Sequence, residues 1–69
     1  MNNRTNLYVY DILKQFVAGD IEKFDAYGLV FDQLDARRIT LTKICDIANT
    51  VGLNPGVVRM RRHQFLGMR

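Results

Sequence analysis

Residues 44–63 read ICDIANTVGLNPGVVRMRRH, and they hold the strongest structural signals in this chain of 69 residues. Apolar residues recur at steps of three and four before Gly52, which predicts a helix that Thr40 caps and the glycine ends. Asn54 suits the position before a helix and Pro55 suits the first helical position, so we expect a second helix directly after the turn. The apolar stripe of the first helix consists of Leu41, Ile44, Ile47, Ala48 and Val51.

The same residues resemble the helix-turn-helix of small bacterial and phage DNA-binding regulators. That family has a small residue where the first helix approaches the second, and Ala48 stands at this position. Gly52 follows four residues later, where the turn takes a positive φ that glycine adopts without strain. Leu53 would fill the space between the two helices, and Val58 would pack the second helix back on Ala48.

The chain departs from the family pattern at Arg61, where an apolar residue is usual. Either Met60 takes that place through a small rotation of the helix, or the aliphatic stem of Arg61 covers the core. The resemblance implies that the second helix enters the major groove of double-stranded DNA, where Arg59 could bridge two acceptors of guanine. For each arginine the alternative is a solvated charge on a helix face. The candidate DNA-binding residues are Asn54, Arg59, Met60 and His63 at the start and on the outer face of the helix, and Thr42, Lys43, Arg61, Arg62 and Arg69 for phosphates.

Charge is distributed unevenly between the two halves of the chain. Residues 1–36 carry three basic and six acidic side chains, for a net charge of −3, whereas residues 37–69 carry seven basic and one acidic, for +6. Such asymmetry is typical of proteins that contact nucleic acids or membranes, and here the positive half coincides with the motif. The alternative is a solvated basic face, or a basic face that pairs with the acidic half of the same molecule.

Residues 7–19 predict a further helix, because apolar and aromatic side chains recur there at helical spacing. Thr5 or Asn6 would cap its start, and Gly19 would end it. A strand is the competing interpretation for residues 7–10, which are rich in aromatic and β-branched side chains and could pair with residues 39–41.

Asp20 is the expected N-cap of another helix that extends to Arg37 and Arg38. Gly28 would lie in its interior, at a cost of about 1 kcal/mol relative to alanine, and marks a kink, a break or a close crossing of two helices. The sequence therefore predicts an all-α fold: a small bundle of four helices, or five if Gly28 breaks one, containing a helix-turn-helix. We expect a single domain (residues 1–69), with a packing and dimerisation half (residues 1–38) and a helix-turn-helix half (residues 39–69).

Several classes of protein are excluded by length and composition. The single cysteine, Cys45, and the single histidine, His63, cannot supply a disulfide or a metal site of about four ligands. No stretch approaches the roughly 18 apolar residues of a membrane span, and the N-terminal residues do not resemble a signal peptide, so we expect a cytoplasmic protein. No paired acid and base or activated nucleophile is evident, and we expect no enzyme activity, no cofactor and no small-molecule substrate.

These observations predict a small sequence-specific protein that binds double-stranded DNA and regulates transcription. Because one recognition helix gives weak binding, we expect a homodimer, formed through residues 7–34, which hold more large apolar side chains than two short helices hide. The alternative is a helical protein–protein interaction module, similar to an antitoxin or an inhibitor, whose basic C-terminal half is incidental.

Overall fold

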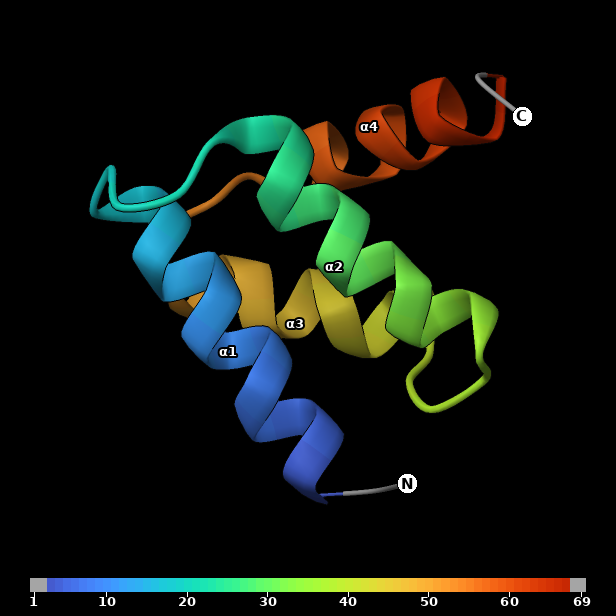
Figure 1. Cartoon of the computed structure of the whole chain (residues 1–69), viewed down its shortest axis with the longest axis horizontal. Helices are drawn as coiled ribbons and strands as arrows, with labels where there is room; N and C mark the ends of the chain where they lie inside the picture. Colours follow the sequence, from blue (N-terminus) through green and yellow to red (C-terminus); the bar gives the residue numbers. More distant parts are fainter. Residues whose placement is uncertain (1–2, 68–69) are drawn as a thin grey trace.

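The computed structural model describes residues 3–67, which form four helices and no strand. They are α1 (Asn3–Val17), α2 (Lys23–Asp35), α3 (Leu41–Thr50) and α4 (Pro55–Gly67). Figure 1 shows α1 and α2 running in opposite directions in front of α3, with α4 behind the upper part of α2. The expected all-α bundle of four helices is confirmed, and the competing strand interpretation is wrong for the described residues.

Three helices end in the same way, with a residue in the left-handed region of φ. These residues are Gly19 (φ 85°), Arg37 (φ 60°) and Gly52 (φ 94°). At the end of α1, the N–H of Gly19 donates to the carbonyl of Phe16 (3.1 Å) and the N–H of Asp20 to that of Gln15 (2.9 Å), which is the pattern of a Schellman motif. The ends predicted at the two glycines are confirmed.

The starts of α3 and α4 also follow the local sequence. The Thr40 side chain accepts a hydrogen bond from the N–H of Lys43 (3.1 Å) and caps α3. The Asn54 Oδ1 accepts one from the N–H of Gly56 (2.8 Å), and α4 begins at Pro55. Both starts confirm the prediction, because a cap joins the side chain of one residue to a backbone N–H group two or three residues later.

The starts of α1 and α2 differ from the prediction. The helix α1 begins at Asn3, so Thr5 is not its N-cap but a buried residue within it, and Asn6 is not its cap either. Asp20 does not cap α2, because α2 begins only at Lys23 and its N-cap position belongs to Glu22, whose side chain makes no capping hydrogen bond. The N–H of Asp20 instead belongs to the closing turn of α1. The turn between two antiparallel helices uses the residues in between, which delays α2 to Lys23.

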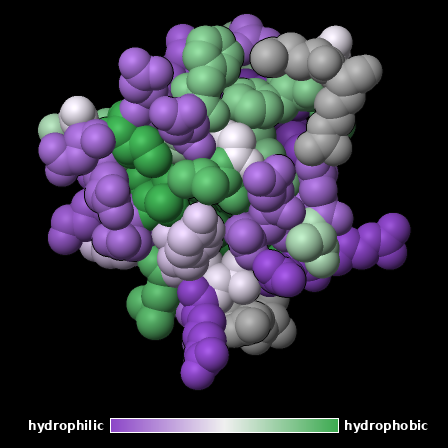
Figure 2. Space-filling view, viewed as in Figure 1, coloured by the Kyte–Doolittle hydropathy of each residue, from purple (hydrophilic) through white to green (hydrophobic). Residues whose placement is uncertain are grey.

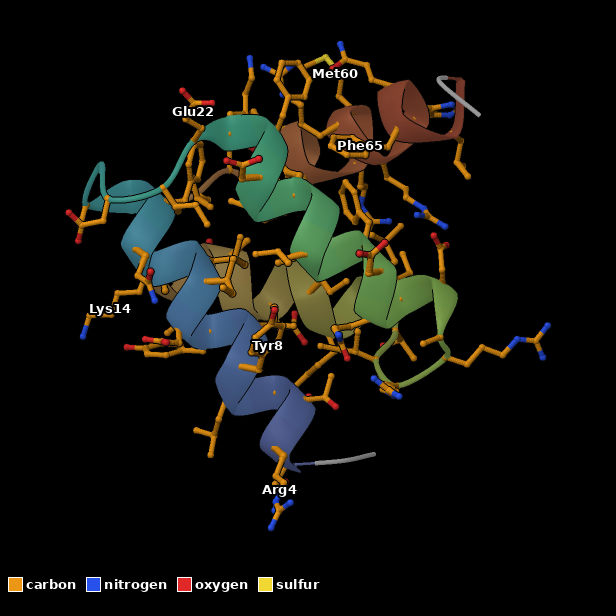
Figure 3. The ribbon with its side chains drawn as sticks, in the orientation of Figure 1. Arg4, Tyr8, Lys14, Glu22, Met60 and Phe65 are labelled. Carbon is orange, nitrogen blue, oxygen red and sulfur yellow. The ribbon has the colours of Figure 1, made fainter. Side chains whose placement is uncertain are left out.

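Gly28 lies inside a continuous α2 and does not break it. A Cβ atom at this position would lie 3.8 Å from Cε1 of Phe65, an ordinary contact distance, so the side chain of Phe65 in α4 lies beside Gly28 without excluding a methyl group. Figure 3 shows Phe65 on the side of α4 that faces α2. The break at Gly28 is therefore wrong, and the packing beside this position does not require a glycine.

The hydrophobic core draws on all four helices. α1 packs on α2 and α3, and α4 packs on α3 and α2. An aromatic chain crosses the bundle: ring centroids lie 5.5 Å apart for Phe16 and Tyr27, 5.6 Å for Tyr27 and Phe31, and 5.3 Å for Phe31 and Phe65. None of the helices formed by residues 3–67 has the length and apolar character of a membrane span. The buried apolar residues are Val9, Ile12, Leu13, Ala26, Tyr27, Val30, Phe31, Ile39, Ile44, Cys45, Ile47, Ala48 and Val58.

Candidate nucleic-acid interface

The connection between α3 and α4 fixes the position of α4 on the bundle. Gly52 has φ 94°, and the N–H of Leu53 donates to the carbonyl of Ala48 (2.8 Å), which closes the end of α3. Ala48 and Val58 are both fully buried, and Leu53 packs against the same core. The side chains that the resemblance assigns to packing between the two helices are therefore in the core or against it.

The outer face of α4 carries three of the candidate residues. Arg59, Met60 and His63 are exposed, and Arg59 and His63 lie four residues apart and hence on the same face. Among the described residues, Arg59 makes no ion pair. Gln64 is exposed beside them and is a polar side chain that the sequence-based set lacks. Figure 3 shows Met60 extending away from the bundle.

Arg62 points back toward α2 instead of outward. Its Nη2 lies 2.6 Å from Oδ1 of Asp35, its guanidinium carbon lies 5.4 Å from the centre of the Phe31 ring, and its side chain is 16% exposed. An ion pair and a cation–π contact therefore tie α4 to α2 at this position. This placement does not favour a phosphate contact by Arg62.

Arg61 occupies the position where the family has an apolar residue. It is half-buried, its Nη1 donates to Oε1 of Gln64 (2.7 Å), and its Nε is buried. Burial raises the pKa of the Tyr27 hydroxyl, and the positive charge of Arg61 opposes this shift. Met60 is 50% exposed whereas Arg61 is half-buried, so of the two residues Arg61 is the one that lies closer to the core.

Basic side chains also lie around the start of α3. Lys43 is half-buried in the first turn beside the exposed Thr42, and Arg37 and Arg38 are exposed in the turn that precedes the helix. The prediction that the second helix extends to these two arginines is wrong, because α2 ends at Asp35. Arg37 and Arg38 stand three and two residues before Thr40, which is the signal that could have linked them to α3. Asn54 is exposed at the start of α4; Arg69 lies outside the described residues.

A shallow groove runs along the outer face of α2, away from the core. It has a volume of about 480 Å³. Apolar side chains gather over α1 and α2 on the face shown in Figure 2. The lining positions recur at steps of three and four, so α2 has a second apolar stripe opposite its buried one. The groove is lined by Ile21, Phe24, Gly28 and Leu29, together with the acidic Asp25 and Asp32.

No group of three or more metal-ligating side chains that could hold an ion is present among residues 3–67. No family model matches the chain, and neither a curated protein nor a solved structure matches it.

Proposed function

We propose that this protein binds double-stranded DNA by inserting the outer face of α4 into the major groove. The observation that carries the proposal is the turn before α4: Gly52 has a positive φ between the fully buried Ala48 and Val58. This packing presents an exposed helix face with Arg59 in its first half and His63 one turn later. A helix can enter a major groove only with such an uncovered face.

The roles of the side chains follow from their donors and acceptors. Arg59 reads guanine, because its guanidinium can donate to N7 and O6 at once, and the apolar Met60 can contact a thymine methyl group. The Oδ1 of Asn54 accepts from Gly56, which leaves its amide N–H groups for DNA. Thr42 and Lys43 hold phosphate at the start of α3, where backbone N–H groups favour an anion.

In this proposal, the protein is a transcriptional regulator that binds DNA as a homodimer. One helix with a few phosphate contacts binds weakly and in a salt-sensitive way, and a second copy supplies the second half-site. Because α1 packs on α2 and α3, pairing through α1 leaves α4 uncovered in both copies.

The test is selection of duplexes from a randomised library with the full chain, followed by fluorescence anisotropy on the selected duplex. We expect binding that weakens steeply between 50 and 200 mM salt, as for proteins that neutralise several phosphates. The Arg59→Ala variant should lose about ten- to a hundredfold in affinity and its preference at one guanine. Arg38→Ala is the matched control, because it also removes one positive charge and should change affinity for all duplexes alike.

Two results would contradict the proposal. One is the absence of binding to any duplex at tens of micromolar protein in low salt. The other is an equal loss for Arg59→Ala and Arg38→Ala with no change in sequence preference, which would reduce the contact to unspecific attraction.

A protein–protein interaction module is the second candidate, and the groove on α2 favours it. Apolar side chains between Asp25 and Asp32 suit an amphipathic helix with basic flanks, which would bury the apolar stripe and pair with the carboxylates. This function would be supported by failure to bind DNA, together with saturable binding of a Leu- and Lys-rich helical peptide. Asp25→Lys and Asp32→Lys should then abolish that binding.

A further inference from the structure

The face of α1 that points away from the core carries exposed apolar side chains at both sides of a charged centre. Val9 and Leu13 are fully buried on the inner side, whereas Leu7 is 69% exposed and Val17 is 50% exposed. Leu7 lies in the first half of the helix, and Val17 is its last residue. The outer stripe, at steps of three and four, consists of Leu7, Tyr10, Asp11, Lys14 and Val17, and it continues to Ala18, whose N–H donates to the carbonyl of Lys14 directly after the helix.

The order of side chains along this stripe is self-complementary. Positions 11 and 14 are symmetric about the midpoint between residues 12 and 13, and so are positions 7 and 18 and positions 8 and 17. In two antiparallel copies related by a two-fold axis at this midpoint, Asp11 faces the partner's Lys14, and Lys14 faces the partner's Asp11. Leu7 faces the partner's Ala18 at both ends, so opposite charges meet in the centre and apolar side chains meet outside them.

We propose that two copies of this chain pair through the outer stripe of α1 in this antiparallel arrangement. The other exposed apolar stripe, on α2, is a poorer surface for a second copy. Its acidic residues, Asp25 and Asp32, would be brought against the same two carboxylates across a two-fold axis, and like charges in an interface oppose association. Of these two stripes, the one on α1 matches itself in charge.

Contacts within one copy already order the charged side chains of the stripe. The Nε2 of Gln15 donates to Oδ2 of Asp11 (3.1 Å), and the Nζ of Lys14 lies 5.8 Å from the centre of the Tyr10 ring. Holding a side chain in place before association reduces the entropy lost on binding. Lys14 and Met60 extend from different sides of the molecule (Figure 3), so the pairing surface is separate from the outer face of α4.

The size of the stripe indicates a weak and reversible dimer. Twelve residues of helix are about 18 Å long, and with a width of about 10 Å they cover far less than the roughly 800 Å² per partner of a standard interface. We therefore expect a dissociation constant in the micromolar range. A duplex with two half-sites would then bring two copies together and favour the dimer.

The experiment is sedimentation equilibrium of the full chain without DNA, from about 1 to 500 μM. We expect a monomer–dimer equilibrium whose dissociation constant rises about tenfold or more in Asp11→Lys and in Lys14→Asp, since each change sets two pairs of like charges against each other. The double variant D11K/K14D exchanges the two charges and should restore the wild-type constant. Asp46→Lys, a charge reversal at an exposed position of α3, is the matched control and should leave the constant unchanged.

The proposal is overturned if the wild-type chain is a monomer at 500 μM, or if the double variant dimerises as weakly as the single variants. Dimerisation that none of the variants changes would also overturn it and would assign the pairing to another face. Circular dichroism on each variant separates loss of pairing from loss of fold. The inference rests on the proposed function, in which the dimer binds DNA. Because the sedimentation experiment contains no DNA, it tests pairing alone. A monomer that binds DNA would contradict only the pairing, and a dimer that binds no DNA would contradict only the proposed function.

Discussion

Arg37 holds a backbone conformation that suits glycine better than arginine. It takes φ 60° at the end of α2, at the position that Gly19 and Gly52 occupy at the ends of α1 and α3. The left-handed conformation costs an L-residue roughly 1–2 kcal/mol, because its Cβ approaches the following carbonyl oxygen. Glycine avoids that strain but loses about 0.5–1 kcal/mol more entropy on folding. We therefore expect Arg37→Gly to raise the free energy of unfolding by about 0.5–1 kcal/mol.

In a domain of this length, such a gain raises the Tm by about 3–6 °C. Circular dichroism during heating and urea titration at constant pH measure the two quantities. Arg37→Ala is the matched control for the lost charge: it removes the guanidinium and keeps the strain, so its Tm should stay close to that of the wild-type chain.

Gly52→Ala provides a test of opposite sign. No atom lies within 4 Å of a Cβ built at Gly52, so the substitution adds backbone strain at φ 94° without a clash. It should lower the free energy of unfolding by at least as much as Arg37→Gly raises it. If Arg37→Gly is no more stable than Arg37→Ala, strain at this helix end is not the cause and the reasoning fails.

Three further substitutions test the packing of the bundle. Arg62→Ala removes an ion pair and a cation–π contact at a side chain that is 16% exposed, so it should lower the free energy of unfolding by about 1–2 kcal/mol in urea titration. The control Arg59→Ala should change this free energy by no more than about 0.5 kcal/mol, and equal losses in the two variants would contradict the reasoning. Burial raises the pKa of Tyr27 in the folded state above its value in the unfolded chain. The contribution of the protonated hydroxyl to the free energy of unfolding is therefore full below about pH 10 and falls as the pH rises further. Tyr27→Phe should therefore flatten the alkaline loss of stability; an unchanged pH profile would exclude Tyr27 as its source. Gly28→Ala should raise the Tm by a few degrees, because a Cβ would meet Phe65 at an ordinary 3.8 Å inside a helix, and a fall in Tm would show that α4 cannot accommodate it.

Local sequence determined where α3 and α4 begin and where α1 and α3 end. Thr40 and Asn54 bond to N–H groups within three residues of themselves, and the conformation of Gly52 depends on the absence of its own Cβ. Interactions of this range are readable without knowledge of the fold. The position of Ala48 on the inner face of its helix also followed from the sequence, because helical periodicity separates an inner from an outer face.

Part of the candidate site was readable in the same way. The exposed positions of Arg59 and His63 follow from their spacing to Val58 on one helix. The inward position of Arg62 was also accessible, because it lies four residues after the buried Val58, although the resemblance favoured an outward position.

Contacts between distant segments depend on the fold as a whole. The partner of Arg62 is Asp35, 27 residues earlier, and Phe65 fills the space beside Gly28. No local rule predicts these contacts, because they exist only once α4 has packed on α2. The left-handed Arg37 belongs to the same group: the chain must turn there for Ile39 to reach the core, and the burial of that side chain outweighs the strain of a residue that has a Cβ.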